Sequence, residues 1–426
     1  MIDRKIIKKI KNYYNSKEIV VLIGSRQVGK STILKQIEKE IIKNNYWTFL
    51  DADFNSNLLL LKSSKDLLDL LELEWYEKNN SQKFIVFIDE FQKIENIWTI
   101  IKWIYDRFEN IKFFLSGSSS ILINKAFWDS MMWRKVIFNI ERLDFEEFLE
   151  FRWENKLLKI YKNINLEQNI SFYLEDFEKN IQDFLTYGWY PQVVLSKNSE
   201  YKIKKLDEII NSYIQKDILD FFKPEHSSNI IKLLKYLTQV NSNLLKKSVI
   251  SNTLWITDYN LWKYLSVLEE TFFIKKLEPF FTNKIKTITK TNEIFFSDVW
   301  LYNSLLKNFN EIDLRIDKWI LVENFVYTEL LKQKSILDEI FFYRDNNQLE
   351  VDFIIKNANI LLPIEVKAWT QEKIPANIIN FCKKNSLNKA LVINKNIFKI
   401  EEKNWLKILF IPHFLTGRIF EFMNKF

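Results

Sequence analysis

The first third of the chain alternates short apolar runs with helical patterns. Four nearly continuous apolar runs predict buried strands: residues 18–24, 47–51, 84–89 and 113–116. Three stretches with helical periodicity lie before or between them: residues 1–17, 30–44 and 58–78. Strands that alternate with helices indicate βαβ units and a parallel sheet. We therefore expect an α/β domain over residues 1–150.

The middle of the chain changes to a mainly helical pattern. Residues 151–227 are expected to form a helical lid, with a turn at Gly188 and Pro191. Residues 228–300 contain three short helical patterns followed by two strand-like runs, which is the outline of a winged helix. The helices are expected at 229–239, 243–251 and 257–269, and the strands at 272–280 and 287–296.

The last part of the chain, residues 301–426, predicts a small α/β domain. A helix precedes three strands, and a second helix and strand follow: 319–333, 340–344, 349–355, 360–367, 375–384 and 389–394. The chain has no internal repeat and no low-complexity linker, so we expect its domains to pack closely.

The composition limits the kinds of chemical site that the chain can form. Of the 426 residues, 47% are hydrophobic and 27% are charged, which is typical of a globular protein. The single cysteine, Cys382, excludes an intrachain disulfide, and two histidines are too few for a multi-histidine metal site. The formal net charge of +7 is compatible with a phosphate-bearing partner but does not by itself indicate one.

Hydropathy places no segment in a membrane. No apolar run reaches the roughly 18 residues of a membrane helix. The first residues also lack the apolar core of a signal peptide. We therefore expect a cytoplasmic protein with no membrane partner.

Residues 24–31, with the sequence GSRQVGKS, match the phosphate-loop pattern G-x-x-x-x-G-K-[ST]. The glycines let backbone N–H groups surround a phosphate, and the following helix directs its positive end at it. Lys30 is expected to reach the β- and γ-phosphates, and Ser31 to ligate Mg²⁺. The expected nucleotide-binding residues are Gly24, Ser25, Arg26, Gln27, Val28, Gly29, Lys30, Ser31 and Thr32.

Two further strand ends are expected beside this loop. The run at 84–89 ends in Asp89 and Glu90, so Asp89 is expected to support Mg²⁺ and Glu90 to activate a water. The next strand ends in hydroxyl residues, of which Ser116 and Ser118 are candidates to contact the γ-phosphate; a polar loop with a helix cap explains them as well. Arg134 is a candidate to neutralise charge in the transition state, although most arginines are only solvated surface charges.

The order of these motifs resembles bacterial and archaeal AAA-type ATPases that join a P-loop domain to a C-terminal domain of unknown function. The matching segments are GSRQVGKST, FIDEFQKI, FFLSGSSS, RLDFEEFLEF, YGWYPQVV, ENFVYTEL, LEVDFII and IEVKA. The resemblance implies ATP rather than GTP as the nucleotide, and Arg134 as an arginine finger. An arginine finger that acts across subunits implies a homo-oligomer. The chain departs from the family at Trp133, where glycine is usual, and in the Tyr187–Pro191 segment.

A second group of charged residues lies in the last hundred positions. Glu365 and Lys367 share one face of a predicted strand, and Asp352 lies on the preceding strand. These residues are expected to position a water for phosphodiester hydrolysis. Asp352, Glu365 and Glu323, on the helix before the strands, are expected to bind Mg²⁺. This pattern resembles the PD-(D/E)xK nuclease core, but solvated charges on half-exposed strands would produce it as well.

The predicted winged helix leaves the nature of the partner open. The helix at 257–269 carries one basic residue, Lys263, which is a poor surface for phosphates. The wing lysines Lys284, Lys286 and Lys290 would suit phosphates better, although a packing role for this domain is the simpler interpretation. Nucleic acid is thus an expected partner, with DNA favoured over RNA. The alternative is a nucleotide-switched binding or assembly module with slow turnover and no nuclease activity.

Overall fold

The computed structural model describes residues 2, 4–42, 45–54, 61–74, 76–77, 82–117, 133–281, 287, 290–358 and 360–426. The chain divides into two compact units, Met1–Arg142 and Leu143–Phe426. The first unit ends a few residues before the expected boundary at 150, because helix α7 (Phe145–Phe151) belongs to the second unit. The boundaries expected at 227 and 300 fall inside the second unit.

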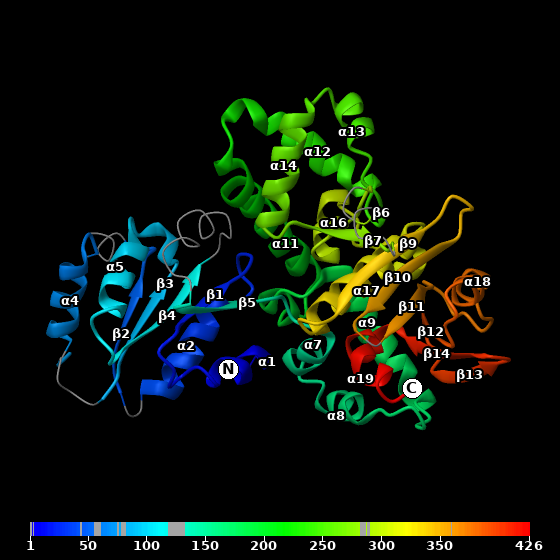
Figure 1. Ribbon diagram of the computed structural model, residues 1–426, viewed down its shortest axis with the longest axis horizontal. Coiled ribbons are helices and arrows are strands. Elements are labelled where there is room, and N and C mark those ends of the chain that lie inside the picture. Colours follow the sequence, from blue (N-terminus) through cyan, green and yellow to red (C-terminus); the bar gives the residue numbers. More distant parts are fainter. Residues whose placement is uncertain are drawn as a thin grey trace. The chain divides into compact units, whose positions relative to one another are not determined.

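The first unit is built on a parallel sheet (Figure 1). Its strands lie in the order β2-β3-β4-β1-β5. Their bounds are β1 Ile19–Ile23, β2 Tyr46–Asp51, β3 Phe84–Asp89, β4 Ile111–Gly117 and β5 Lys135–Asn139. Four of these strands were expected. The edge strand β5 was not: its apolar run is only three residues long, Val136 to Phe138, and none of its residues is buried.

Helices cover both faces of this sheet, as a parallel sheet requires. They are α1 (Lys5–Lys11), α2 (Lys30–Ile41), α4 (Ser64–Leu73) and α5 (Ile97–Tyr105). Alternate side chains of β3 and β4, such as Val86 and Phe113, form one core with Leu67 of α4 and Ile101 of α5. The intervening side chains Phe87 and Phe114 stack on the opposite face with ring centroids 5.3 Å apart. The expected α/β fold is therefore confirmed.

One lysine is buried on the opposite face of this sheet, beside Phe114. Lys112 on β4 is only 1% exposed, and its ammonium group donates to the Glu18 carbonyl and, at 3.4 Å, to the Ser16 hydroxyl. Desolvation lowers the pKa of Lys112 to about 7 from 10.5, although the charge of Glu18 opposes this. In the unfolded chain the side chain recovers its ordinary pKa. Between about pH 7 and 10.5 the unfolded state therefore binds more protons, so stability should rise with pH.

We expect Lys112→Met to stabilise the first unit by about 2 kcal/mol near pH 6. The substitution removes the cost of burying a charged ammonium group, and this cost is larger than the stabilisation that is lost with its two hydrogen bonds. The gain should shrink toward pH 10, where wild type no longer has to bury a charge. Thermal melts of wild type, Lys112→Met and the surface control Lys9→Met across this range measure it. A gain that does not depend on pH would contradict the prediction.

The second unit begins with a group of helices. They are α7, α8 (Asn155–Asn163), α9 (Leu174–Tyr187), α10 (Pro191–Val194) and α11 (Ser199–Tyr213). Helix α7 starts with a capping box, because Asp144 and Glu147 each accept a hydrogen bond from the other's backbone N–H. Gly188 ends α9 and Pro191 begins α10, so the expected turn lies between these two helices.

A nine-stranded sheet runs through the rest of the second unit (Figure 1). The order is β13-β14-β12-β11-β10-β9-β7-β8-β6. The first three strands of the unit are β6 (Asn243–Leu244), β7 (Ile274–Pro279) and β8 (Glu293–Phe296), with helices α12 (Ser227–Gln239), α13 (Lys247–Leu254) and α14 (Asp258–Glu270). The helix expected from 243 thus begins four residues later, because Asn243 and Leu244 pair with β8.

The C-terminal α/β domain follows the expected order closely. It contains α17 (Lys318–Gln333), β9 (Glu339–Arg344), β10 (Glu350–Lys356), β11 (Leu361–Val366), α18 (Ala376–Lys384) and β12 (Lys389–Asn394). Two further strands, β13 (Lys399–Lys403) and β14 (Leu406–Pro412), complete the sheet. Strand β7 pairs in parallel with β9, so this sheet continues into the strands after α14. Among the described residues, no helix combines the length and apolarity needed to cross a bilayer.

Candidate functional site

The expected phosphate loop leaves β1 at its carboxyl end and enters α2. Gly29 begins this helix with φ of 99°, a conformation that favours glycine. Gly24 has a different reason to lack a side chain, because a Cβ there would lie 2.4 Å from the Ile140 carbonyl oxygen. These two glycines shape residues 24–31 into a turn, and the amino end of α2 follows it directly.

Lys30 is held inside the loop. Its side chain is buried, and its Nζ donates to the carbonyl oxygens of Gly24 at 3.0 Å and Ser25 at 2.9 Å. Ser25 and Val28 are also buried, Ser31 is half-buried, and Gln27 and Thr32 are exposed. The loop residues named from the sequence therefore form one contiguous structure around the Lys30 ammonium group.

Arg4 reaches the same loop from a distant position in the sequence. Its guanidinium donates to the carbonyl of Val28 at 2.9 Å and to that of Glu141 at 2.7 Å. The side chain is 7% exposed. No sequence signal marked Arg4, which lies directly before α1. The structure shows that it joins the phosphate loop to the end of the first unit.

Asp89 and Glu90 lie at the carboxyl end of β3, on the same side of the sheet as the phosphate loop that follows β1. Strand β4 separates β1 from β3, with Ile23 aligned to Gly117 and Ile88 to Leu115. The Ser116 hydroxyl donates to Asp89 Oδ1, so the hydroxyl candidate of β4 meets the acidic end of β3. Ser118 lies outside the described residues.

Glu90 has an unusual backbone conformation. Its φ is 51°, in the left-handed region, and such conformations are frequent at functional sites. Its N–H donates to Asp89 Oδ1 at 3.1 Å, and its Oε2 accepts from Gln92 Nε2 at 2.5 Å. Gln92 was not predicted. It is placed next to Gly117, where a Cβ would lie 2.5 Å from its Oε1.

Arg134 lies at the opposite end of the strands from the phosphate loop. Its carbonyl accepts from the N–H of Ile19, at the amino end of β1, whereas the phosphate loop follows the carboxyl end. Its guanidinium binds Asp106 with a shortest distance of 2.9 Å. A five-residue strand is roughly 17 Å long. An arginine-finger role for Arg134 would therefore require a second protomer.

In the second unit, the predicted carboxylates meet at the centre of the nine-stranded sheet. Asp352 Oδ2 accepts from the Val366 N–H at 2.6 Å, and Glu365 Oε1 accepts from Lys367 Nζ at 2.6 Å. Glu365 is 3% exposed, and its Oε2 has no hydrogen-bond partner among the described residues. His413 Nε2 donates to the Lys367 carbonyl at 2.7 Å and so holds this strand end.

Burial and mutual repulsion shape the electrostatics of this cluster. Desolvation, followed by the charges of Glu365 and Glu323, raises the pKa of Asp352 well above its ordinary value. Desolvation, Glu293 and Glu350 do the same to the pKa of Glu323. Desolvation lowers the pKa of Lys367, but its carboxylate neighbours outweigh this and the net change is upward. The cluster therefore brings together more carboxyl groups than its cations can neutralise, so that protonation of some of these carboxyls is favoured.

Two members of this carboxylate cluster were missed in the sequence. Glu350 lies two residues before Asp352, so strand periodicity was a signal for it. Glu293 lies on β8 and had no such signal. It is 6% exposed, and desolvation, Glu350 and Asp352 raise its pKa well above its ordinary value. Glu293 comes from the strands after α14, so two predicted domains contribute to one cluster.

As placed, the cluster is not a preformed metal site. Within the described ranges, no group of three or more His, Cys, Asp or Glu side chains is arranged to hold a metal ion. The physical reason is that Asp352 and Glu365 direct one oxygen each to a protein donor. The roles of Glu323, Asp352 and Glu365 as metal ligands remain predictions.

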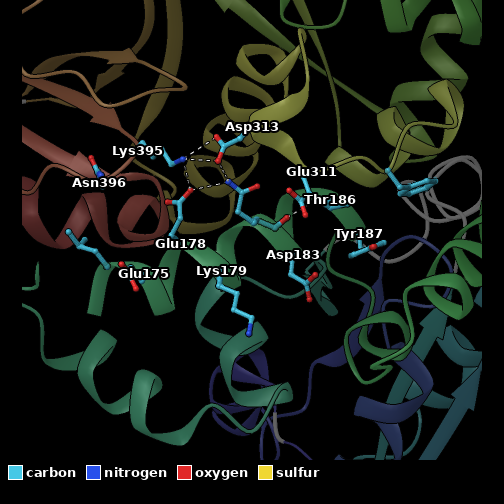
Figure 2. A pocket seen from close by; sticks show the side chains of 13 residues that line it. Glu175, Glu178, Lys179, Asp183, Thr186, Tyr187, Glu311, Asp313, Lys395 and Asn396 are labelled. Carbon is cyan, nitrogen blue, oxygen red and sulfur yellow. Dashed lines mark hydrogen bonds and ion pairs between the residues drawn. The ribbon is translucent and has the colours of Figure 1, made fainter. Parts of the chain in front are cut away.

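A separate hollow of about 600 Å³ lies between α9, residues 309–313 and the segment after β12 (Figure 2). Lys395 points at Glu178 and Asp313 and forms ion pairs with them at 3.4 Å and 2.8 Å. None of the predicted site residues lines this hollow. Its ion pairs connect α9 and residues 309–313 to the segment after β12.

Comparison with protein families supports the assignment of the first unit. Residues 16–149 match a family model described as an AAA domain. The first unit is therefore similar to an AAA domain over nearly its whole length. Its parallel strand order and its phosphate loop agree with the α/β fold of P-loop proteins. Residues 178–312 and 320–414 match two domains of unknown function, DUF8612 and DUF4143.

Similarity to other proteins extends beyond residues 16–149. An uncharacterized protein of Methanocaldococcus jannaschii is 28% identical over 356 residues, which cover 80% of this chain and 73% of the relative. A second uncharacterized protein of that organism is 24% identical over 321 residues, which cover 72% of this chain and 65% of that protein.

Solved structures give a looser likeness. The RuvB Holliday junction branch migration motor of Thermotoga maritima is 14% identical, with 65% of this chain and 90% of its own covered and a TM-score of 0.32. The Aeropyrum pernix ORC2 protein is 11% identical, with 71% and 91% covered and a TM-score of 0.37. Similarity at this level carries no argument about function.

Proposed function

We propose that the first unit binds and hydrolyses ATP. The observation that carries this proposal is the meeting of three strand ends: the phosphate loop with Lys30, the Asp89–Glu90 pair, and Ser116. Lys30 donates to loop carbonyls and can exchange these bonds for phosphate oxygens without leaving the loop. The AAA domain match supports the same activity.

The residues at these strand ends have different roles in the proposed hydrolysis. Ser31 and Asp89 offer the hydroxyl and carboxylate oxygens that suit Mg²⁺, which would neutralise phosphate charge. Lys30 and the amino end of α2 bind the phosphates. Glu90 accepts a proton from the attacking water, and Gln92 orients its carboxylate. Ser116 fixes Asp89.

The test is nucleotide binding and phosphate release by the purified chain, with ATP or GTP, with and without Mg²⁺. Turnover that requires Mg²⁺ and prefers ATP supports the proposal. Tight ATP binding with negligible turnover would instead support the alternative, a nucleotide-switched binding module. Absence of any nucleotide binding would overturn both.

A second activity is proposed for the carboxylate cluster: hydrolysis of phosphodiester bonds, with DNA favoured over RNA. The specific observation is that Asp352, Glu365 and Lys367 lie in one cluster, while Glu365 Oε2 is buried without a hydrogen-bond partner among the described residues. Such an oxygen suits a cation that enters with substrate. Nucleotide binding by the first unit would then control this activity.

Labelled single- and double-stranded DNA, incubated with Mg²⁺ or Mn²⁺, tests the second activity. We expect Lys367→Ala to cut at least about tenfold more slowly, because a cation beside the scissile phosphate is lost. Lys356→Ala, on the neighbouring strand and paired with Glu339, is the matched control. Equal cutting by wild type and Lys367→Ala would exclude this site.

A further inference from the structure

A basic hollow lies at the start of α13, apart from the residues assigned above. It has a volume of about 440 Å³, within the range of small-ligand sites. Four lysines and three polar side chains line it together with Leu245: Lys246, Lys247, Lys276, Lys290, Ser248, Thr291 and Asn292. No Asp or Glu is among the described residues of its lining.

Three of the four lysine charges are not neutralised. Lys276 forms an ion pair with Glu269 at 2.5 Å. Lys246, Lys247 and Lys290 make no ion pair and no side-chain hydrogen bond with any residue that the structure describes, and all three are exposed. Like charges around one hollow repel one another, so an anion in the hollow is favoured.

The backbone adds to this preference. Helix α13 begins here, and Lys246 at its N-cap provides no side-chain cap. The first N–H groups of a helix have no partner within the helix and carry its partial positive charge. Together with the hydroxyls of Ser248 and Thr291, they offer donors to a tetrahedral anion. Lysines, N–H groups and hydroxyls without a carboxylate are the donor set that binds phosphate.

We infer that this hollow binds phosphate groups of a nucleic-acid backbone. The inference deepens the proposed action on DNA and rests on it for the identity of the ligand. The hollow shares Lys246 with a second hollow of about 310 Å³, which Arg344 also lines. Arg344 forms an ion pair at 3.0 Å with Glu350 of the carboxylate cluster.

The chain also connects the two sites directly. Asn292 lines the basic hollow, and the next residue, Glu293, belongs to the carboxylate cluster. A lone phosphate would need only the hollow, whereas a polymer of phosphates can occupy the hollow and continue past Arg344 to the carboxylates. Helix α14, the third helix of the predicted winged helix, offers less, because the ammonium of its Lys263 lies over the Phe222 ring, 5.6 Å from the centroid. Lys284 and Lys286 of the expected wing lie outside the described residues.

The test compares the full-length chain with a triple variant, Lys246→Ala, Lys247→Ala and Lys290→Ala. The control removes the same charge at three exposed lysines elsewhere in the second unit: Lys204→Ala, Lys373→Ala and Lys403→Ala. Binding of labelled single-stranded DNA, duplex DNA and RNA is measured over a range of salt. All proteins carry Lys30→Ala, so that the phosphate loop does not contribute, and thermal melts verify folding.

We expect the hollow variant to bind at least about tenfold more weakly at ~0.1 M salt, and its log–log salt slope to fall by about 2–3. The control should keep both the affinity and the slope of the parent. Pyrophosphate should compete only weakly if a polymer is the ligand; full competition at equal phosphate concentration would assign the hollow to a small phosphate compound and overturn the inference.

Other outcomes separate this inference from the proposed activities. Nucleic-acid binding that is unchanged in the hollow variant would overturn it, as would a Lys30→Ala parent that binds no nucleic acid at low salt. Neither result would bear on ATP turnover, which is measured in chains that keep Lys30. Lysine-dependent binding without metal-dependent cutting would support the hollow and reject the proposed cleavage.

Discussion

Lys30→Ala is expected to lower ATP binding and turnover by about 100-fold or more. Lys30 is the buried cation of the phosphate loop, and its Nζ already lies within 3.0 Å of two loop carbonyls. Alanine would leave phosphate charge without this partner, and preorganised donors of this kind contribute about two orders of magnitude each. Nucleotide titration and phosphate release measure the two effects separately.

Glu90→Gln in the same assay should separate binding from hydrolysis. The amide keeps the shape of the side chain but cannot accept the proton of the attacking water. ATP binding should survive while turnover falls by about 10²–10⁴. Lys39→Ala, exposed on α2, and Glu95→Gln, exposed after β3, are matched controls and should behave as wild type. Wild-type turnover in Glu90→Gln would assign the water to another group.

Gly188→Ala is expected to destabilise the second unit by about 4 kcal/mol and to lower its melting temperature by about 10 °C. Gly188 has φ of 73° and ψ of −157°, a backbone conformation that residues with a side chain rarely adopt. A Cβ there would lie 2.6 Å from Cβ and 2.9 Å from Cδ1 of Trp300, which is fully buried. Backbone strain and steric overlap therefore add.

The control for this stability measurement is Leu195→Ala, near the end of α10. Leu195 is 53% exposed, so its truncation should change the free energy of unfolding by less than about 0.5 kcal/mol. Denaturant and thermal unfolding of both variants are compared with wild type. A melting temperature of Gly188→Ala equal to that of Leu195→Ala would show that Trp300 moves aside at little cost.

The local motifs were predictable because their chemistry is contiguous in the chain. In the phosphate loop, glycine conformations and Lys30 lie within eight residues, and the loop backbone itself forms the site. The order of α17, β9, β10, β11, α18 and β12 also followed from hydrophobic periodicity. Pairing of Glu365 with Lys367 followed from the two-residue repeat of a strand.

Contacts between distant segments could not be predicted in this way. Arg4 binds the Val28 carbonyl across 24 positions, and Ser116 reaches Asp89 only because β4 lies between β1 and β3. Strand β5 has a short apolar run and no buried residue, and Asn243 and Leu244 form a strand only through β8. In each case a segment that is distant in the sequence determines the contact or the strand pairing.

The sequence by itself determined the α/β class of the first unit, the phosphate loop and the acidic residues at two strand ends. Periodicity and local spacing suffice for these features, since neighbours in the chain are neighbours in space. Only the tertiary structure decided that β7 pairs with β9, that Glu293 joins the C-terminal carboxylates, and that the lysines around α13 surround one hollow. These features depend on strand pairing over long separations, which buried side chains and backbone hydrogen bonds select together.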